Sequence, residues 1–173
     1  MKTRNRKLFW CCLLVCLNVL FIWGNSILPA EVSNRFSQSV MEVLEKLSEL
    51  PILDKITVFI RDIFGFVDTT DAEELTPGGI LRKIAHFTEF LCLGMSLCWL
   101  FQILEQKGIH RFIMPQFCGM LVAFVDETIQ LFSPGRAGSV VDVWIDTAGV
   151  FVGVILLLSF DHFIKKHNQI GGT

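Results

Sequence analysis

Four long apolar stretches dominate the pattern of hydrophobic and polar positions along the chain. They cover about residues 8–28, 83–104, 112–132 and 140–160, and each is close to the length of 20 helical residues that crosses the hydrocarbon core of a bilayer. Because a membrane leaves no water to bond the backbone, a spanning segment of this kind is expected to be helical. The pattern predicts an all-α, polytopic membrane protein with four transmembrane helices.

The segment between the first two stretches has a different pattern. Apolar residues recur every three or four positions from Val32 to Leu50, Pro51 interrupts them, and the period resumes from Ile52 to Ile63. This predicts short amphipathic helices in the first outer loop, which lie on the membrane surface or cap the bundle. A packing role is favoured over a ligand-binding role for this loop.

The same pattern suggests a division of the chain into four parts. We expect an N-terminal transmembrane anchor at 1–30, an extracytoplasmic amphipathic loop at 31–80, a three-helix core at 81–162 and a cytoplasmic tail at 163–173. The first stretch could instead be a cleaved signal peptide, since it follows a basic start. Its apolar run is long for that, and bulky Leu28 lies where a cut after Ala30 needs a small residue, so an uncleaved anchor is expected.

Basic residues beside the spans predict the orientation. Lys and Arg gather in the short N-terminal segment, in the short loop around Lys107 and Arg111, and at Lys165 and Lys166. Short basic loops stay on the cytoplasmic side. The chain is therefore expected to be a multi-pass protein of the cell membrane with both termini in the cytoplasm.

Composition supports a bilayer environment. Of 173 residues, 52% are hydrophobic and 18% are charged, below the roughly 25% charged residues of soluble domains. A net charge of −2 without a basic stripe gives no basis for nucleic-acid binding. The six cysteines all lie in apolar runs, which argues against a disulfide framework or a zinc site. No metal ion or cofactor is expected, and the oligomeric state is left open.

Ionisable residues recur inside the last three spans, although each costs roughly 2.5–3.5 kcal/mol on insertion scales. At 1.5 Å per residue, Glu89, Glu127 and Asp146 each lie about 9–10 Å below the outer end of their helix. This common depth predicts a site in the outer third of the membrane. Its candidate residues are Lys83, His86, Glu89, Asp126, Glu127, Gln130, Arg136, Asp142 and Asp146.

The faces of the helices agree with this prediction. Arg82, His86 and Glu89 share one stripe of their helix, and Asp142 and Asp146 share a stripe with Gly149 and Gly153 of the last helix. Small residues spaced in this way let membrane helices pack closely. The acidic stripe is therefore expected to face the bundle, with the first helix as scaffold.

Simpler roles are open for several of these residues. Ser139 and Asp142 match a capping box. Arg136 could be a counter-ion for Asp142 or Glu127, or its guanidinium could bind an anionic head group. His86 could be satisfied by a neighbouring carboxylate.

Four motifs together resemble the VanZ-like family of bacterial membrane proteins. They are KIAHFTEF at 83–90, DETIQLF at 126–132, PGRAGSVVD at 134–142, and DTAG at 146–149 followed by Gly153. The resemblance covers about residues 81–160. Its matching residues are Lys83, His86, Glu127, Gln130, Arg136, Asp142 and Gly149, whereas Asp146 stands where the family more usually has asparagine. The named member is associated with low-level resistance to the glycopeptide teicoplanin, which makes a role in the cell envelope the expectation here.

Several functions fit these features. The favoured one is binding of an anionic lipid-linked or cell-wall component at the outer face, with an effect on glycopeptide susceptibility. The second is an intramembrane enzyme, such as a metal-dependent hydrolase or transferase acting on a lipid head group. His86, Glu89, Asp126, Glu127 and Asp142 could supply its oxygen and nitrogen ligands or a general acid/base pair. The HxxE of His86 and Glu89 lacks the second histidine of HExxH, and no catalytic residue is assigned. A transporter or proton relay would also use buried carboxylates. A purely structural salt-bridge network is the fourth possibility.

Overall fold

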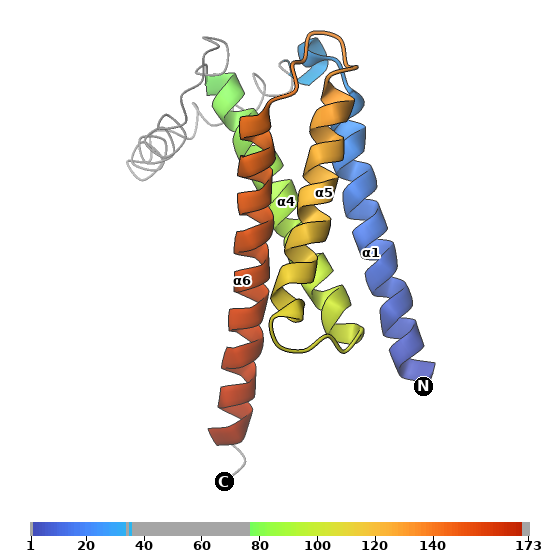
Figure 1. Ribbon diagram of the computed structural model, residues 1–173, viewed down its shortest axis with the longest axis vertical. Coiled ribbons are helices and arrows are strands. Elements are labelled where there is room, and N and C mark those ends of the chain that lie inside the picture. The colour runs from blue at the N-terminus through green and yellow to red at the C-terminus, as the bar shows by residue number, and fades with distance from the viewer. Residues whose placement is uncertain (1, 34, 36–76, 171–173) are drawn as a thin grey trace.

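The computed structural model describes residues 2–33, 35 and 77–170, and this part of the chain is built from long helices (Figure 1). The helices are α1 (Lys2–Ile27), α4 (Pro77–Ile103), α5 (His110–Gln130) and α6 (Val140–Ile170). All four are long and apolar enough to cross a membrane, which confirms the four predicted spans and the all-α class. The last helix continues past the expected end at residue 160. Most of the predicted amphipathic loop, residues 36–76, lies outside the described residues.

The helices run alternately up and down (Figure 1). The start of α1 and the end of α6 lie at the same end of the bundle as the connection between α4 and α5. The connection between α5 and α6, residues 131–139, lies at the opposite end. Helix α4 packs against the other three helices, and α5 packs against α1 and α6.

Glycines set the close packing of α4 and α6. A Cβ atom built on Gly153 would lie 2.1 Å from the carbonyl oxygen of Leu91, and one on Gly149 would lie 2.5 Å from that of Phe87. From the other side, a Cβ on Gly94 would lie 2.4 Å from the carbonyl oxygen of Val150. The two backbones therefore touch over about two helical turns, as the glycine spacing predicted.

Apolar side chains fill the interior and also cover the outside. The described core includes Phe90, Leu93, Ala123, Val150 and Val154, all fully buried. Large apolar side chains that are more than half exposed include Phe9, Phe21, Phe124, Phe132, Trp144 and Phe160. An apolar surface of this extent is unfavourable in water and favourable in contact with lipid tails. The chain is therefore a multi-pass membrane protein.

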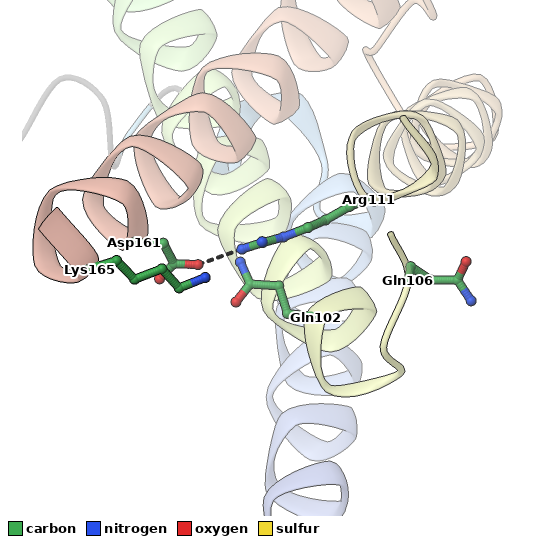
Figure 2. Close-up of a pocket in the computed structure, with 5 residues that line it drawn as sticks. All are labelled: Gln102, Gln106, Arg111, Asp161 and Lys165. Carbon is green, nitrogen blue, oxygen red and sulfur yellow. Dashed lines mark hydrogen bonds and ion pairs between the residues drawn. The ribbon is translucent and has the colours of Figure 1, made fainter. Parts of the chain in front are cut away.

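A polar group also lies at the end of the bundle opposite the 131–139 connection. Arg111 of α5 donates from Nη2 to the Oδ2 carboxylate oxygen of Asp161 in α6. These two residues line an open pocket of about 340 Å³ together with Gln102, Gln106 and Lys165. In Figure 2 the side chain of Gln106 points away from the other four, which lie close together. The ion pair ties α5 to α6 at this end.

Candidate functional site

The nine predicted site residues, called the polar cluster below, lie at the end of the bundle that carries the 131–139 connection. They are Lys83, His86 and Glu89 on α4, Asp126, Glu127 and Gln130 on α5, Arg136 on the connection, and Asp142 and Asp146 on α6. Five of them are buried in the bundle: Lys83, Asp126, Glu127, Gln130 and Asp146. Their assignment to a function is a prediction, and the structure gives the contacts among them.

A buried ion pair joins the second turn of α4 to the first turn of α6. Lys83 Nζ lies 3.2 Å from Asp142 Oδ1, and the two side chains keep only 6% and 16% of their exposure. Such a pair offsets part of the cost of removing both charges from water. It also places Lys83 opposite α6 and so sets how α4 and α6 face each other.

Glu127 joins α5 to the start of α6. Its Oε2 accepts a hydrogen bond from the backbone N–H of Ser139 at 2.8 Å, and its Oε1 accepts one from Gln130 Nε2 at 2.9 Å. The predicted capping box is therefore wrong, because the Ser139 N–H is bonded by Glu127 and Asp142 is paired with Lys83. The close approach of the 131–139 connection to α5 explains the difference, since a Cβ on Gly138 would lie 2.7 Å from the carbonyl oxygen of Glu127.

Asp126 lies at the centre of the polar cluster, fully buried. Its Oδ2 accepts a hydrogen bond from Gln130 Nε2 at 3.0 Å and lies 3.7 Å from His86 Nδ1. The second distance is too long for a hydrogen bond. Both His86 Nδ1 and Asp126 Oδ1 are buried without a hydrogen-bond partner among the described residues. His86 is thus not satisfied by its carboxylate neighbour.

The first helix contributes to the site, contrary to the expectation that it serves only as scaffold. Asn25 Nδ2 donates to Glu89 Oε1 at 2.8 Å, and Ser133 Oγ donates to the backbone carbonyl of Ser26 at 2.6 Å. The N–H of Ala30 also donates to the carbonyl of Pro134. The signal in the sequence was present: Asn25 and Ser26 are adjacent polar residues near the end of an otherwise apolar run.

Replacing Asn25 should loosen this attachment of α1. In Asn25→Ala neither oxygen of the Glu89 carboxylate has a partner among the described residues, since Oε2 has none there in the native chain. A buried acceptor left unbonded costs about 1–3 kcal/mol, so the unfolding free energy in mixed micelles should fall by that amount. Asn18→Ala is the matched control, since Asn18 bonds only the carbonyl of Leu14 in its own helix. Equal stability of the two variants would contradict the contact.

Arg136 lies on the connection and is half-buried. Its Nε and Nη1 atoms are buried without a hydrogen-bond partner among the described residues. Burial lowers the pKa of its guanidinium and nearby Arg82 adds to this, while the carboxylates of Asp126, Glu127 and Glu89 act in the opposite direction. The guanidinium remains charged in proteins. Arg136 is therefore a cation near carboxylates that no described carboxylate holds by a hydrogen bond through Nε or Nη1.

Asp146 is the most isolated carboxylate of the polar cluster. It is 1% exposed, and both of its oxygens lack a hydrogen-bond partner among the described residues. One ligand atom from each of His86, Asp126 and Asp146 lies within 4.8 Å of the other two. In the part of the chain that the structure describes, this trio is the group whose chemistry fits a metal ion, although the sequence showed no metal motif.

Comparison with known proteins identifies the family. No curated protein and no solved structure matches the chain significantly. The family model described as VanZ/LLP1 matches residues 9–161, which include most of α1 and the whole polar cluster. The match extends the resemblance of residues 81–160 toward the N-terminus and agrees with the part that α1 plays at the site. The chain belongs to the VanZ/LLP1 family.

Proposed function

We propose that this membrane protein acts in the cell envelope, where it binds an anionic lipid-linked or cell-wall component at the outer end of the bundle and alters susceptibility to teicoplanin-type glycopeptides. The observation that carries the proposal is that Nε and Nη1 of the Arg136 guanidinium have no hydrogen-bond partner among the described residues. Its location on the connecting segment, rather than deep in the bundle, suits a ligand that approaches from the membrane surface.

The other contacts of the site support a ligand-binding role for Arg136. Its two candidate counter-ions have other partners: Asp142 forms an ion pair with Lys83, and Glu127 accepts a hydrogen bond from the N–H of Ser139. A guanidinium presents paired N–H groups that match the oxygens of a phosphate. Arg82 lies close enough to lower the pKa of Arg136 and would add a second cation for the same ligand.

The proposed orientation places this end outside the cell. Basic residues flank the opposite end, at Arg4, Arg6, Lys107, Lys165 and Lys166, and short basic flanks stay in the cytoplasm. An anionic component of the outer leaflet would then meet Arg136 directly.

An Arg136→Ala variant tests the proposal. A dye-labelled polyprenyl diphosphate, titrated into purified protein in neutral detergent, should bind at least about tenfold more weakly, because a hydrogen bond to a charged group contributes about 1.5–3 kcal/mol. Arg136→Lys should recover only part of the affinity, since lysine lacks the planar fork. Cells that carry Arg136→Ala should lose any shift in teicoplanin susceptibility that the native chain confers.

Lys107→Ala is the matched control, because it removes one positive charge from the exposed connection at the other end. The control should bind the labelled diphosphate as the native chain does. Unchanged affinity and unchanged susceptibility in Arg136→Ala, with native folding by size exclusion, would refute the proposal.

A transporter or relay receives less support from the same geometry. Between the polar cluster and the Arg111–Asp161 pair, the described core is formed by apolar side chains such as Leu93, Leu97 and Val154. An enzyme acting on a lipid head group remains the second candidate, because His86, Asp126 and Asp146 place nitrogen and oxygen ligands together.

A further inference from the structure

We propose that His86, Asp126 and Asp146 form a site for a divalent transition-metal ion of the zinc type, held between α4, α5 and α6. This inference does not rest on the proposed binding of an anionic ligand. Each residue supplies one ligand atom, and these three atoms lie within 4.8 Å of one another.

The unbonded atoms of these side chains point to a missing partner. Asp146 is 1% exposed and Asp126 is fully buried, yet neither Asp146 oxygen nor Asp126 Oδ1 has a hydrogen-bond partner among the described residues. The same holds for Nδ1 of His86. Four unbonded acceptor or donor atoms in one buried group are unusual, because each costs free energy unless it is bonded.

Charge balance favours a divalent cation over a basic side chain. Neither cation of the polar cluster bonds the two carboxylates of this trio among the described residues: Lys83 contacts Asp142, and Nε and Nη1 of nearby Arg136 have no hydrogen-bond partner. A divalent ion would balance the negative charges of the Asp126 and Asp146 carboxylates, and it would also bind the imidazole of His86. Imidazole suits Zn²⁺ and carboxylates complete the oxygen ligands, a mixed set with three protein ligands and one position left for water.

The three ligand atoms, now within 4.8 Å of one another, would have to move closer together on binding. Ligand atoms around a tetrahedral zinc ion, at bonds of about 2.0–2.1 Å, stand about 3.3 Å apart. His86 Nδ1 lies 3.7 Å from Asp126 Oδ2, the oxygen that Gln130 bonds. Oδ1 of the same carboxylate, unbonded among the described residues, is the oxygen left for the ion. Gln130 holds Asp126 by its hydrogen bond to Oδ2, as a neighbouring group that orients a metal ligand does.

Zinc binding by the full chain tests the inference. Purified protein in detergent is equilibrated with Zn²⁺ alone, freed of excess ion, and assayed for metal by mass spectrometry. The native chain should keep one zinc ion per chain. Asp146→Asn and His86→Gln should each lower the affinity by more than the roughly 10–100-fold typical of changes beside a metal ligand.

Asp161→Asn is the matched control, since it makes the same substitution about 22 Å farther along α6 and should keep the ion. Arg136→Ala should also keep it, because loss of a nearby positive charge cannot weaken a cation site. Zinc retained in Arg136→Ala together with loss of diphosphate binding would separate this site from the proposed ligand site.

X-ray absorption of zinc in the native chain gives a test without any variant. The ion should show an imidazole and oxygen ligands at about 2.0–2.1 Å, and no sulfur at about 2.3 Å. The six free cysteines make sulfur ligands the natural mark of adventitious binding. Sulfur-bound zinc, no stoichiometric zinc, or zinc kept by both Asp146→Asn and His86→Gln would each overturn the inference.

Discussion

Gly153→Ala should disrupt the packing of α4 against α6 more than any other single-methyl change in the described bundle. The new Cβ would lie 2.1 Å from the carbonyl oxygen of Leu91 and 3.1 Å from the backbone nitrogen of Met95. Backbone atoms cannot turn aside as a side chain does, so the two helices must separate. Overpacking typically lowers the free energy of unfolding by about 1–3 kcal/mol, and by more where a backbone must shift. We expect Gly153→Ala to lose about 3 kcal/mol or more. Unfolding in mixed micelles measures the loss.

Gly24→Ala is the control for this substitution. Gly24 is also a helical glycine, but nothing lies within 4 Å of its added Cβ. Its replacement should leave stability unchanged or raise it slightly, since alanine favours the helix by about 0.8–1 kcal/mol in water. If Gly153→Ala were as stable as Gly24→Ala, the close contact of α4 with α6 would not exist.

Lys83→Ala should have the second large effect. It removes the cation that lies 3.2 Å from Asp142 and leaves that carboxylate buried without its partner. Breaking a buried pair from one side costs about 3–5 kcal/mol, and the lower end is expected here because Asp142 retains some exposure. The same unfolding assay gives the change, and the variant should also express poorly in membranes.

Removing both charges should restore much of this loss. In Lys83→Met with Asp142→Asn neither member of this ion pair is charged, and replacing a buried ion pair with uncharged groups is often neutral. The cycle compares this double variant with Lys83→Met and Asp142→Asn alone. The double-mutant cycle should therefore show a coupling of about 1 kcal/mol or more between these residues. Additive effects would mean that the ion pair does not stabilise the contact between α4 and α6.

The apolar runs of the sequence were enough to predict the spans. A stretch of about 20 apolar residues has only one stable arrangement in a bilayer, a helix that bonds its own backbone. The common depth of Glu89, Glu127 and Asp146 also followed from the sequence, because rise per residue is fixed within a helix. The same regularity placed Gly149 and Gly153 on the stripe of Asp142 and Asp146 that packs against α4.

The partner of each polar side chain was decided only by the tertiary structure. Periodicity gives the face of one helix but not its rotation and shift against a neighbour, which the close backbone contact at Gly94 and Gly153 sets. Glu127 therefore bonds the N–H of Ser139, where the local sequence suggested Asp142. The link from Asn25 to Glu89 joins residues far apart in the chain and depends on how α1 packs against α4.

Asp146 shows most clearly which features the sequence determined and which the tertiary structure decided. The sequence by itself determined that Asp146 lies on a bundle-facing stripe at the depth of the other acids. Only the packing of α4, α5 and α6 decided that it is buried beside His86 and Asp126 with both oxygens unbonded. The physical reason is that hydrogen bonds and metal geometry depend on distances of a few ångströms between helices, and the sequence of each single helix does not contain those distances.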